Sequence, residues 1–114
     1  MKKSLLLFAL IVSSCSSFKS GLTIPANETF ILGESNSKNY SAELLNISNY
    51  ELKIRGEKKQ NGEYTQVFML PPKVKVNVYV SSDEIIKFIN ENNQAVKVNV
   101  KLNKEVPGMR YIKN

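Results

Sequence analysis

The sequence predicts an all-β protein: a small antiparallel β-sandwich of about seven strands, with immunoglobulin-like or related topology. Three observations lead to this prediction. Apolar and polar residues alternate in several short runs, as they do in strands with one buried face. Asn, Gly, Ser and Pro separate these runs at intervals of about 8–12 residues. The chain has 114 residues, which is the size of one domain with a modest core.

Four expected strands precede Pro71, each a short apolar or alternating run bounded by turn residues: 30–32, 40–44, 50–55 and 64–70. Asn61-Gly62 lies between the third and fourth of these runs. Asn-Gly between two alternating runs is a strong hairpin signal, because both residues tolerate a positive φ. We therefore expect the last two of these strands to pair antiparallel to each other.

The second half of the chain contains its clearest alternation. Residues 73–80 place four valines on one side, and residues 95–102 place three valines and a leucine on one side. Pro71-Pro72 ends the strand before the first run, because proline cannot donate to a ladder. Both runs are typical of half-buried strands in an antiparallel sheet. Residues 109–112 form a last expected short strand.

Residues 82–92 fit two structures. Ser81 and Glu84 match a helix capping box. Four apolar residues could then lie on one helix face: Ile85, Ile86, Phe88 and Ile89. The run is nevertheless short and β-branched, and Asn92-Asn93 suits a hairpin turn before the next strand. We expect a strand here, and a helix near 82–91 would make the domain α+β instead.

The N-terminal segment has the features of a secretory signal peptide. Lys2 and Lys3 precede an apolar run over residues 5–12, and small residues follow it. This run of eight residues is too short to span a bilayer, which takes about 20 residues. We therefore expect an export signal rather than a permanent transmembrane helix.

The residues Val12-Ser13-Ser14-Cys15 resemble the lipobox of bacterial lipoproteins. In that family the cysteine thiol receives a diacylglycerol, the peptide is cut before the cysteine, and the new amino group is usually acylated. The commonest pattern has Leu before the small pair and Gly or Ala next to Cys, where this chain has Val12 and Ser14. An ordinary signal peptide cut after a nearby serine would instead leave Cys15 as a free thiol.

The resemblance implies a division of the chain and a location. Residues 1–14 would be the lipoprotein signal peptide, residues 15–21 the lipidated cysteine with a short linker, and residues 22–114 a single β-sandwich domain. The protein would be held in the bacterial cell envelope by its N-terminal acyl chains. Ser16, rather than Asp, follows the cysteine, which resembles retention at the outer membrane, facing the periplasm.

The composition excludes several classes of chemistry. The chain has no His, one Cys and one Asp (Asp83), so we expect no metal site, no cofactor and no catalytic residues. The adjacent acids Asp83 and Glu84 are interpreted as a turn or cap. Without Lys2 and Lys3 the net charge is +4, from 14 basic and 10 acidic residues. The lysines are scattered and arginine is rare, so we expect no nucleic-acid binding.

Two polar stripes are the best candidates for an interaction surface. They lie opposite the valines of the two alternating runs and comprise Lys73, Lys75, Asn77 and Tyr79, and Lys97, Asn99 and Lys101. If both strands belong to one sheet, these residues form a Lys/Asn/Tyr face suited to an acidic protein, a glycan or lipid phosphates. The alternative interpretation is a solvated face whose lysines protect an edge from aggregation.

The sequence supports two hypotheses for function. The first is a non-catalytic accessory lipoprotein that docks onto an envelope protein through a strand edge or a sheet face. The second is a lipoprotein that binds a glycan or an anionic lipid on the Lys/Asn/Tyr face. We favour the first, because an interaction module needs no recognisable constellation of catalytic residues.

Overall fold

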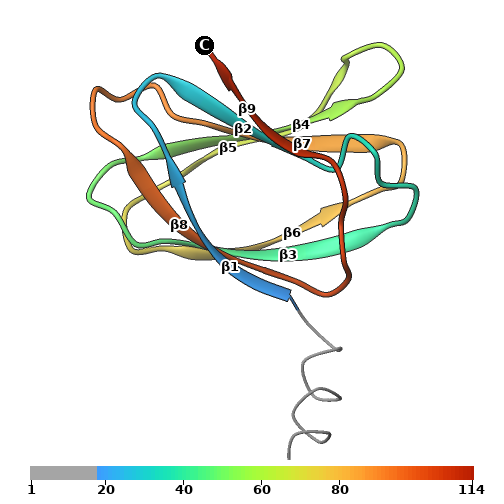
Figure 1. Ribbon diagram of the computed structural model, residues 1–114, viewed down its shortest axis with the longest axis horizontal. Coiled ribbons are helices and arrows are strands. Elements are labelled where there is room, and N and C mark those ends of the chain that lie inside the picture. Colours follow the sequence, from blue (N-terminus) through green and yellow to red (C-terminus); the bar gives the residue numbers. More distant parts are fainter. Residues whose placement is uncertain (1–17) are drawn as a thin grey trace, which may run out of the picture.

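The computed structural model describes residues 18–114, and these residues form nine strands and no helix (Figure 1). The strands in chain order are β1 (Phe18–Ile24), β2 (Glu28–Leu32), β3 (Tyr40–Asn46), β4 (Leu52–Lys58), β5 (Tyr64–Leu70), β6 (Lys75–Val80), β7 (Glu84–Ile89), β8 (Val96–Leu102) and β9 (Met109–Lys113). The all-β prediction is confirmed, and β7 is a strand as expected. The count of about seven strands was too low.

The strands form two antiparallel sheets that pack face to face (Figure 1). Sheet A has the order β1-β8-β3-β6, and sheet B has the order β5-β4-β7-β2-β9. Among the strands β1 to β8, only β4 and β5 are neighbours both in the chain and in a sheet, and they form a hairpin. This is the order of a jelly roll, which consists of two Greek keys, with β9 added beside β2. The immunoglobulin order, in which strands ABED face CFG, is not found.

The strand β1 occupies part of the segment predicted to be a linker. Residues 18–21 pair with β8, where Lys19 lies opposite Lys101 and Gly21 lies opposite Asn99. Residues 18–21 show no alternation of apolar and polar side chains, so the sequence did not indicate a strand here. The strand forms by pairing with β8, which is far away in the chain. Residues 15–17 of the predicted linker and the predicted signal peptide, 1–14, lie outside the described residues.

The core lies between the two sheets. Sheet B contributes fully buried residues such as Leu52, Ile54 and Phe88, and sheet A contributes Leu44 and Val98. In β8 every second residue is buried, so the predicted alternation is confirmed there. The β6 run begins later than expected, at residue 75 rather than 73. Burial of each aliphatic side chain contributes about 1.5–3 kcal/mol, and the described residues contain no disulfide to add to this.

Asn90 is completely buried at one end of the sandwich. Its Nδ2 donates to the carbonyl oxygens of Ile24 (3.0 Å), Pro25 (3.1 Å) and Gln94 (2.9 Å). Its Oδ1 accepts from the backbone N–H and the side chain of Asn92, both at 2.9 Å. One side chain therefore ties the β1–β2 turn to the β7–β8 turn.

Asn46 has the same role in the neighbouring pair of turns. It is also completely buried, and its Nδ2 donates to the carbonyl oxygens of Tyr50 (2.8 Å) and Leu70 (3.0 Å). Its Oδ1 accepts from the backbone N–H (3.0 Å) and hydroxyl (2.7 Å) of Ser48. The β3–β4 turn is thereby fixed to the end of β5.

We predict that Asn90→Ala lowers the free energy of unfolding by about 2–4 kcal/mol, because buried carbonyl groups lose their donor and each costs about 1–3 kcal/mol. The nearby Asn93 is exposed, so Asn93→Ala should change stability by less than about 0.5 kcal/mol. Urea unfolding of both variants of the full chain, followed by circular dichroism, measures the difference. Equal stabilities would contradict the role assigned to Asn90.

Candidate functional site

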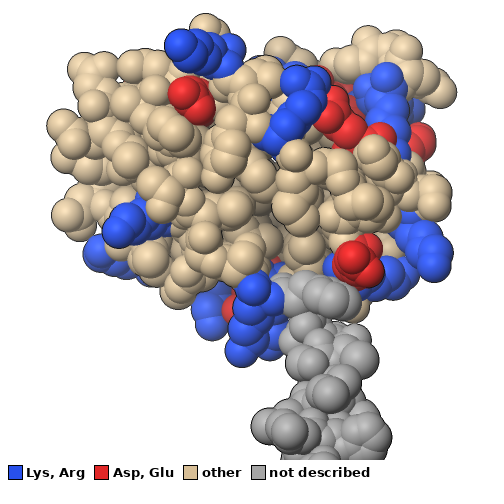
Figure 2. Space-filling model, viewed as in Figure 1, with Lys and Arg blue, Asp and Glu red and all other residues tan. Residues whose placement is uncertain are grey.

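The two predicted polar stripes lie in one sheet and on one face. β6 and β8 both belong to sheet A, where β3 lies between them. Their valines point into the core, so the polar residues between the valines form the outer face of the sheet. Six of the seven predicted residues belong to this surface, the basic face: Lys75, Asn77, Tyr79, Lys97, Asn99 and Lys101. Figure 2 shows basic side chains along the side where sheet A lies in Figure 1.

Lys73 does not belong to the basic face. It precedes β6 and has φ 64°, in the left-handed region, in the turn that follows Pro71-Pro72. Its Nζ donates to the carbonyl oxygen of Ile47 at 2.8 Å, at the end of the sandwich where the buried asparagines lie. The prediction for Lys73 was therefore wrong, because the two prolines and the turn delay the start of the strand by two residues.

The strands β1 and β3 add residues that the sequence analysis did not select. Across the sheet, Lys19 of β1 lies opposite Lys101, and Lys101 lies opposite Glu43 of β3. In the next row outward-facing Leu45 lies between Asn99 and Lys75. Lys19 was missed because β1 was assigned to the linker. No signal in the sequence places β3 between the two stripes.

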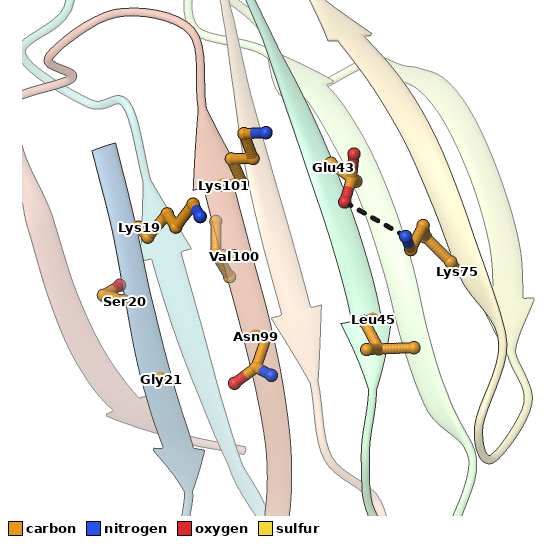
Figure 3. Close-up of a pocket in the computed structure, with 9 residues that line it drawn as sticks. All are labelled: Lys19, Ser20, Gly21, Glu43, Leu45, Lys75, Asn99, Val100 and Lys101. Carbon is orange, nitrogen blue, oxygen red and sulfur yellow. Dashed lines mark ion pairs between the residues drawn. The ribbon is translucent and has the colours of Figure 1, made fainter. Parts of the chain in front are cut away.

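A groove of about 490 Å³ hollows the basic face (Figure 3). Gly21 has no side chain to fill it, and the nearest atom to the position of a Cβ there is Asn99 Oδ1, at 3.5 Å. Lysines from three strands stand around the groove: Lys19, Lys75 and Lys101. Ammonium and amide donors around an open groove suit an anionic group such as a phosphate, a sulfate or a carboxylate.

The charge on this sheet is strongly one-sided. The strands of sheet A carry four lysines, Lys19, Lys75, Lys97 and Lys101, and one acid, Glu43. Lys75 Nζ lies 3.5 Å from Glu43 Oε2. Within the described part of the chain, Lys19, Lys97 and Lys101 form no ion pair. Their charge is therefore available to a ligand.

The outer face of sheet B differs, because its charges are paired. Glu57 is nearly buried, and its carboxylate receives Arg55 Nε at 2.7 Å and Lys87 Nζ at 3.1 Å. Arg110 binds Glu34 through two bonds of 2.7 and 2.9 Å. The hydrogen bond from the Arg110 guanidinium holds the pKa of the Glu34 carboxyl below its ordinary value. Among the described strands, lysines without an ion pair are therefore more numerous in sheet A than in sheet B.

Asp83 lies in the turn that precedes β7, and Glu84 is the first residue of that strand. Glu84 is 5% exposed, and its Oε1 accepts from the backbone N–H and hydroxyl of Ser81, both at 2.9 Å. Its Oε2 accepts from the Thr65 hydroxyl and from Gln66 Nε2. The capping contact between Ser81 and Glu84 therefore forms, but it closes a turn before a strand. Residues 18–114 contain no cluster of three or more His, Cys, Asp or Glu that could hold a metal ion.

No protein-family model and no curated protein sequence matches the chain. Among residues 18–114 there is also no helix of the length and apolarity needed to cross a membrane. Similarity is found at the level of structure. The three matches described below share the sandwich at low sequence identity, so they establish the all-β fold and nothing finer.

A Cupin_2 domain of an XRE family transcriptional regulator from Enterobacter cloacae aligns with a TM-score of 0.54 and 14% identity, over 82% of this chain and 86% of that chain. Peruvianin-I, a cysteine peptidase from Thevetia peruviana latex, aligns with a TM-score of 0.58 and 13% identity, over 86% of this chain and 56% of that chain. The Yersinia pseudotuberculosis-derived mitogen aligns with a TM-score of 0.53 and 16% identity, over 81% of this chain and 88% of that chain.

The hydrogen bonds of Glu84 predict a pH-dependent stability. Burial alone would raise the pKa of this carboxyl, but bonds from Thr65, Ser81 and Gln66 outweigh burial and lower the pKa below the ordinary 4.5. Ionised Glu84 therefore stabilises the fold above about pH 4.5, and this contribution is lost as the pH falls through the lower folded-state pKa.

We predict that Glu84→Gln lowers the free energy of unfolding by about 1–3 kcal/mol at pH 7, and that the difference from the unsubstituted protein shrinks towards about pH 2. Urea unfolding across this pH range measures both effects. Glu105→Gln, at an exposed position, is the matched control and should have little effect. A loss of stability at Glu84→Gln that is the same at every pH would contradict this account.

Proposed function

We propose that this protein is a non-catalytic interaction module of the bacterial cell envelope, anchored to the outer membrane by acyl chains on Cys15 and facing the periplasm. The position of β1 carries the proposal. This strand begins at Phe18, three residues after Cys15. Three residues reach at most about 11 Å, so an acylated Cys15 would keep the domain at the bilayer surface. A domain held so closely acts on molecules at that surface.

The anchor itself follows from the chemistry of acylation. Each buried methylene contributes about 0.8 kcal/mol, and a single acyl chain gives only reversible binding. The two or three chains of a lipoprotein would hold the domain stably. The non-catalytic part of the proposal is supported by Glu84, whose carboxylate is occupied by hydrogen bonds within the fold. The expected partner is an envelope protein.

Cys15→Ala should move the protein from the membrane fraction to the soluble fraction of cells, because the thiol that accepts the diacylglycerol is lost. Ser16→Ala keeps the thiol and should remain in the membrane fraction. Fractionation followed by immunoblotting measures the distribution, and mass spectrometry of the N-terminal peptide tests for the acyl chains. A Cys15→Ala protein that fractionates like the unsubstituted protein would overturn the anchor.

The basic face supports a second candidate function, the binding of an anionic glycan or an anionic lipid. The observation that favours it is the gathering of four lysines and one acid on the outer side of sheet A, where three of the lysines line a groove. Phosphate, sulfate and carboxylate groups would all satisfy the lysine donors. Binding of this kind weakens as salt screens the charges.

The double variant Lys97→Glu/Lys101→Glu should bind anionic probes at least about thirty-fold more weakly, since each lysine near an anionic surface contributes about 1 kcal/mol and each new carboxylate adds repulsion. The probe is fluorescent dextran sulfate, titrated against the detergent-solubilised full chain at low and high salt. Soluble short-chain phosphatidylglycerol as competitor distinguishes a lipid site from a glycan site. Lys113→Glu in β9 is the control. Equal binding by the double variant and the control would exclude the basic face.

A further inference from the structure

The described residues leave four edge strands: β1 and β6 in sheet A, and β5 and β9 in sheet B. Three of these edges carry basic residues, Lys19 in β1, Lys75 in β6, and Arg110 with Lys113 in β9. The seven residues of β5, YTQVFML, include neither a charged residue nor a proline. Charges and prolines are the usual means of preventing an edge from pairing with another chain. β5 is therefore the one edge of the described strands without a charge or a proline, and its pairing with β4 is irregular only near one end, at Thr65.

The rest of the described chain leaves this edge open. The backbone of β5 pairs with β4 on one side, and its carbonyl at Leu70 accepts from Asn46. Its other hydrogen bonds come from side chains: Thr65 donates to Glu84, and Gln66 donates to Glu84 and to the carbonyl oxygen of Tyr79. Three of its apolar side chains are exposed: Tyr64 by 60%, Val67 by 53% and Met69 by 42%. An exposed strand of this length presents a row of unpaired N–H and C=O groups beside apolar side chains.

The charged residue beside β5, Arg55, does not prevent an uncharged strand from pairing with this edge. Arg55 of β4 lies opposite Val67, and its guanidinium is 4.6 Å from the centre of the Tyr64 ring. Arg55 forms an ion pair with Glu57 at 2.7 Å, and Glu57 shares its carboxylate with Lys87. The edge and the strand behind it therefore present an apolar strip with its adjacent charge already paired.

We propose that β5 pairs antiparallel with β5 of a second copy of this chain, joining the two B sheets across a two-fold axis. A two-fold contact needs a surface that complements itself. An axis at Val67 would place Val67 against Val67 of the partner subunit and Thr65 against Met69 of the partner subunit, all uncharged. The uncharged strand β5 can therefore pair with β5 of a second copy, which has the same length and the same uncharged side chains.

The contact between two β5 strands is small, so its strength depends on the membrane anchor. Two copies held at one membrane surface meet at a higher effective concentration than they would in solution, which strengthens a weak contact without adding new ones. In this respect the inference rests on the proposed anchoring through Cys15. The basic face lies on sheet A and stays free in such a dimer, because the pairing extends sheet B.

The test introduces Val67→Cys into the full chain and treats intact cells with a short, membrane-permeable bismaleimide. Two cysteines facing each other across the axis should give a species of twice the monomer mass that contains this chain alone by mass spectrometry. Tyr79→Cys on β6, where the native side chain is 77% exposed, is the matched control and should give little of it. The unsubstituted chain controls for crosslinking through Cys15.

Adding Met69→Lys to Val67→Cys should reduce the crosslinked dimer at least tenfold, because it places a charge in the uncharged edge. A Val67→Cys chain that stays monomeric, or that crosslinks to a different protein, would overturn the pairing of two copies. Fractionation of the same cells separates the two proposals. A monomeric protein in the membrane fraction contradicts the dimer alone, whereas a protein in the soluble fraction contradicts the anchor.

Discussion

The arrangement of the two sheets depends on the buried amide side chains of Asn46 and Asn90, which join the turns at one end of the sandwich. The four connections at this end, β1–β2, β3–β4, β5–β6 and β7–β8, all pass from one sheet to the other. Carbonyl groups at Ile24 and Leu70 are buried there, so each needs a donor from the protein. Two buried amides supply these donors. The sheets are thereby fixed relative to each other, and the apolar faces of β4, β7 and β8 pack in register without a disulfide.

Local patterns in the sequence predicted which residues face the core, and they did so best where alternation was strict. β8 follows the prediction residue by residue, because the alternation of its side chains depends only on the extended backbone. The choice of neighbours in a sheet has no such local signal. β1 pairs with a strand nearly eighty residues away, and its Gly21 fits beside Asn99 across that distance. For this reason both β1 and the jelly-roll order were missed.

The candidate site was predicted in part for the same reason. Polar residues between buried valines must point outward, so the faces of β6 and β8 followed from the sequence once both strands lay in one sheet. Lys73 departed from the pattern because a residue with positive φ after two prolines cannot continue a strand. The hydrogen bonds between Ser81 and Glu84 form at the start of the strand β7 and not at the start of a helix, because the residues that follow pair with β2 and β4.

The distribution of charge connects the two proposed surfaces. Residues 18–114 carry a net charge of +4, and the strands of sheet A alone have four lysines against one glutamate. Sheet B pairs its central charges internally and ends in the uncharged strand β5. An anionic surface would therefore meet unpaired lysines on sheet A, and β5 would remain accessible in the other sheet. Electrostatic attraction and strand pairing thus use different parts of the fold, and one does not obstruct the other.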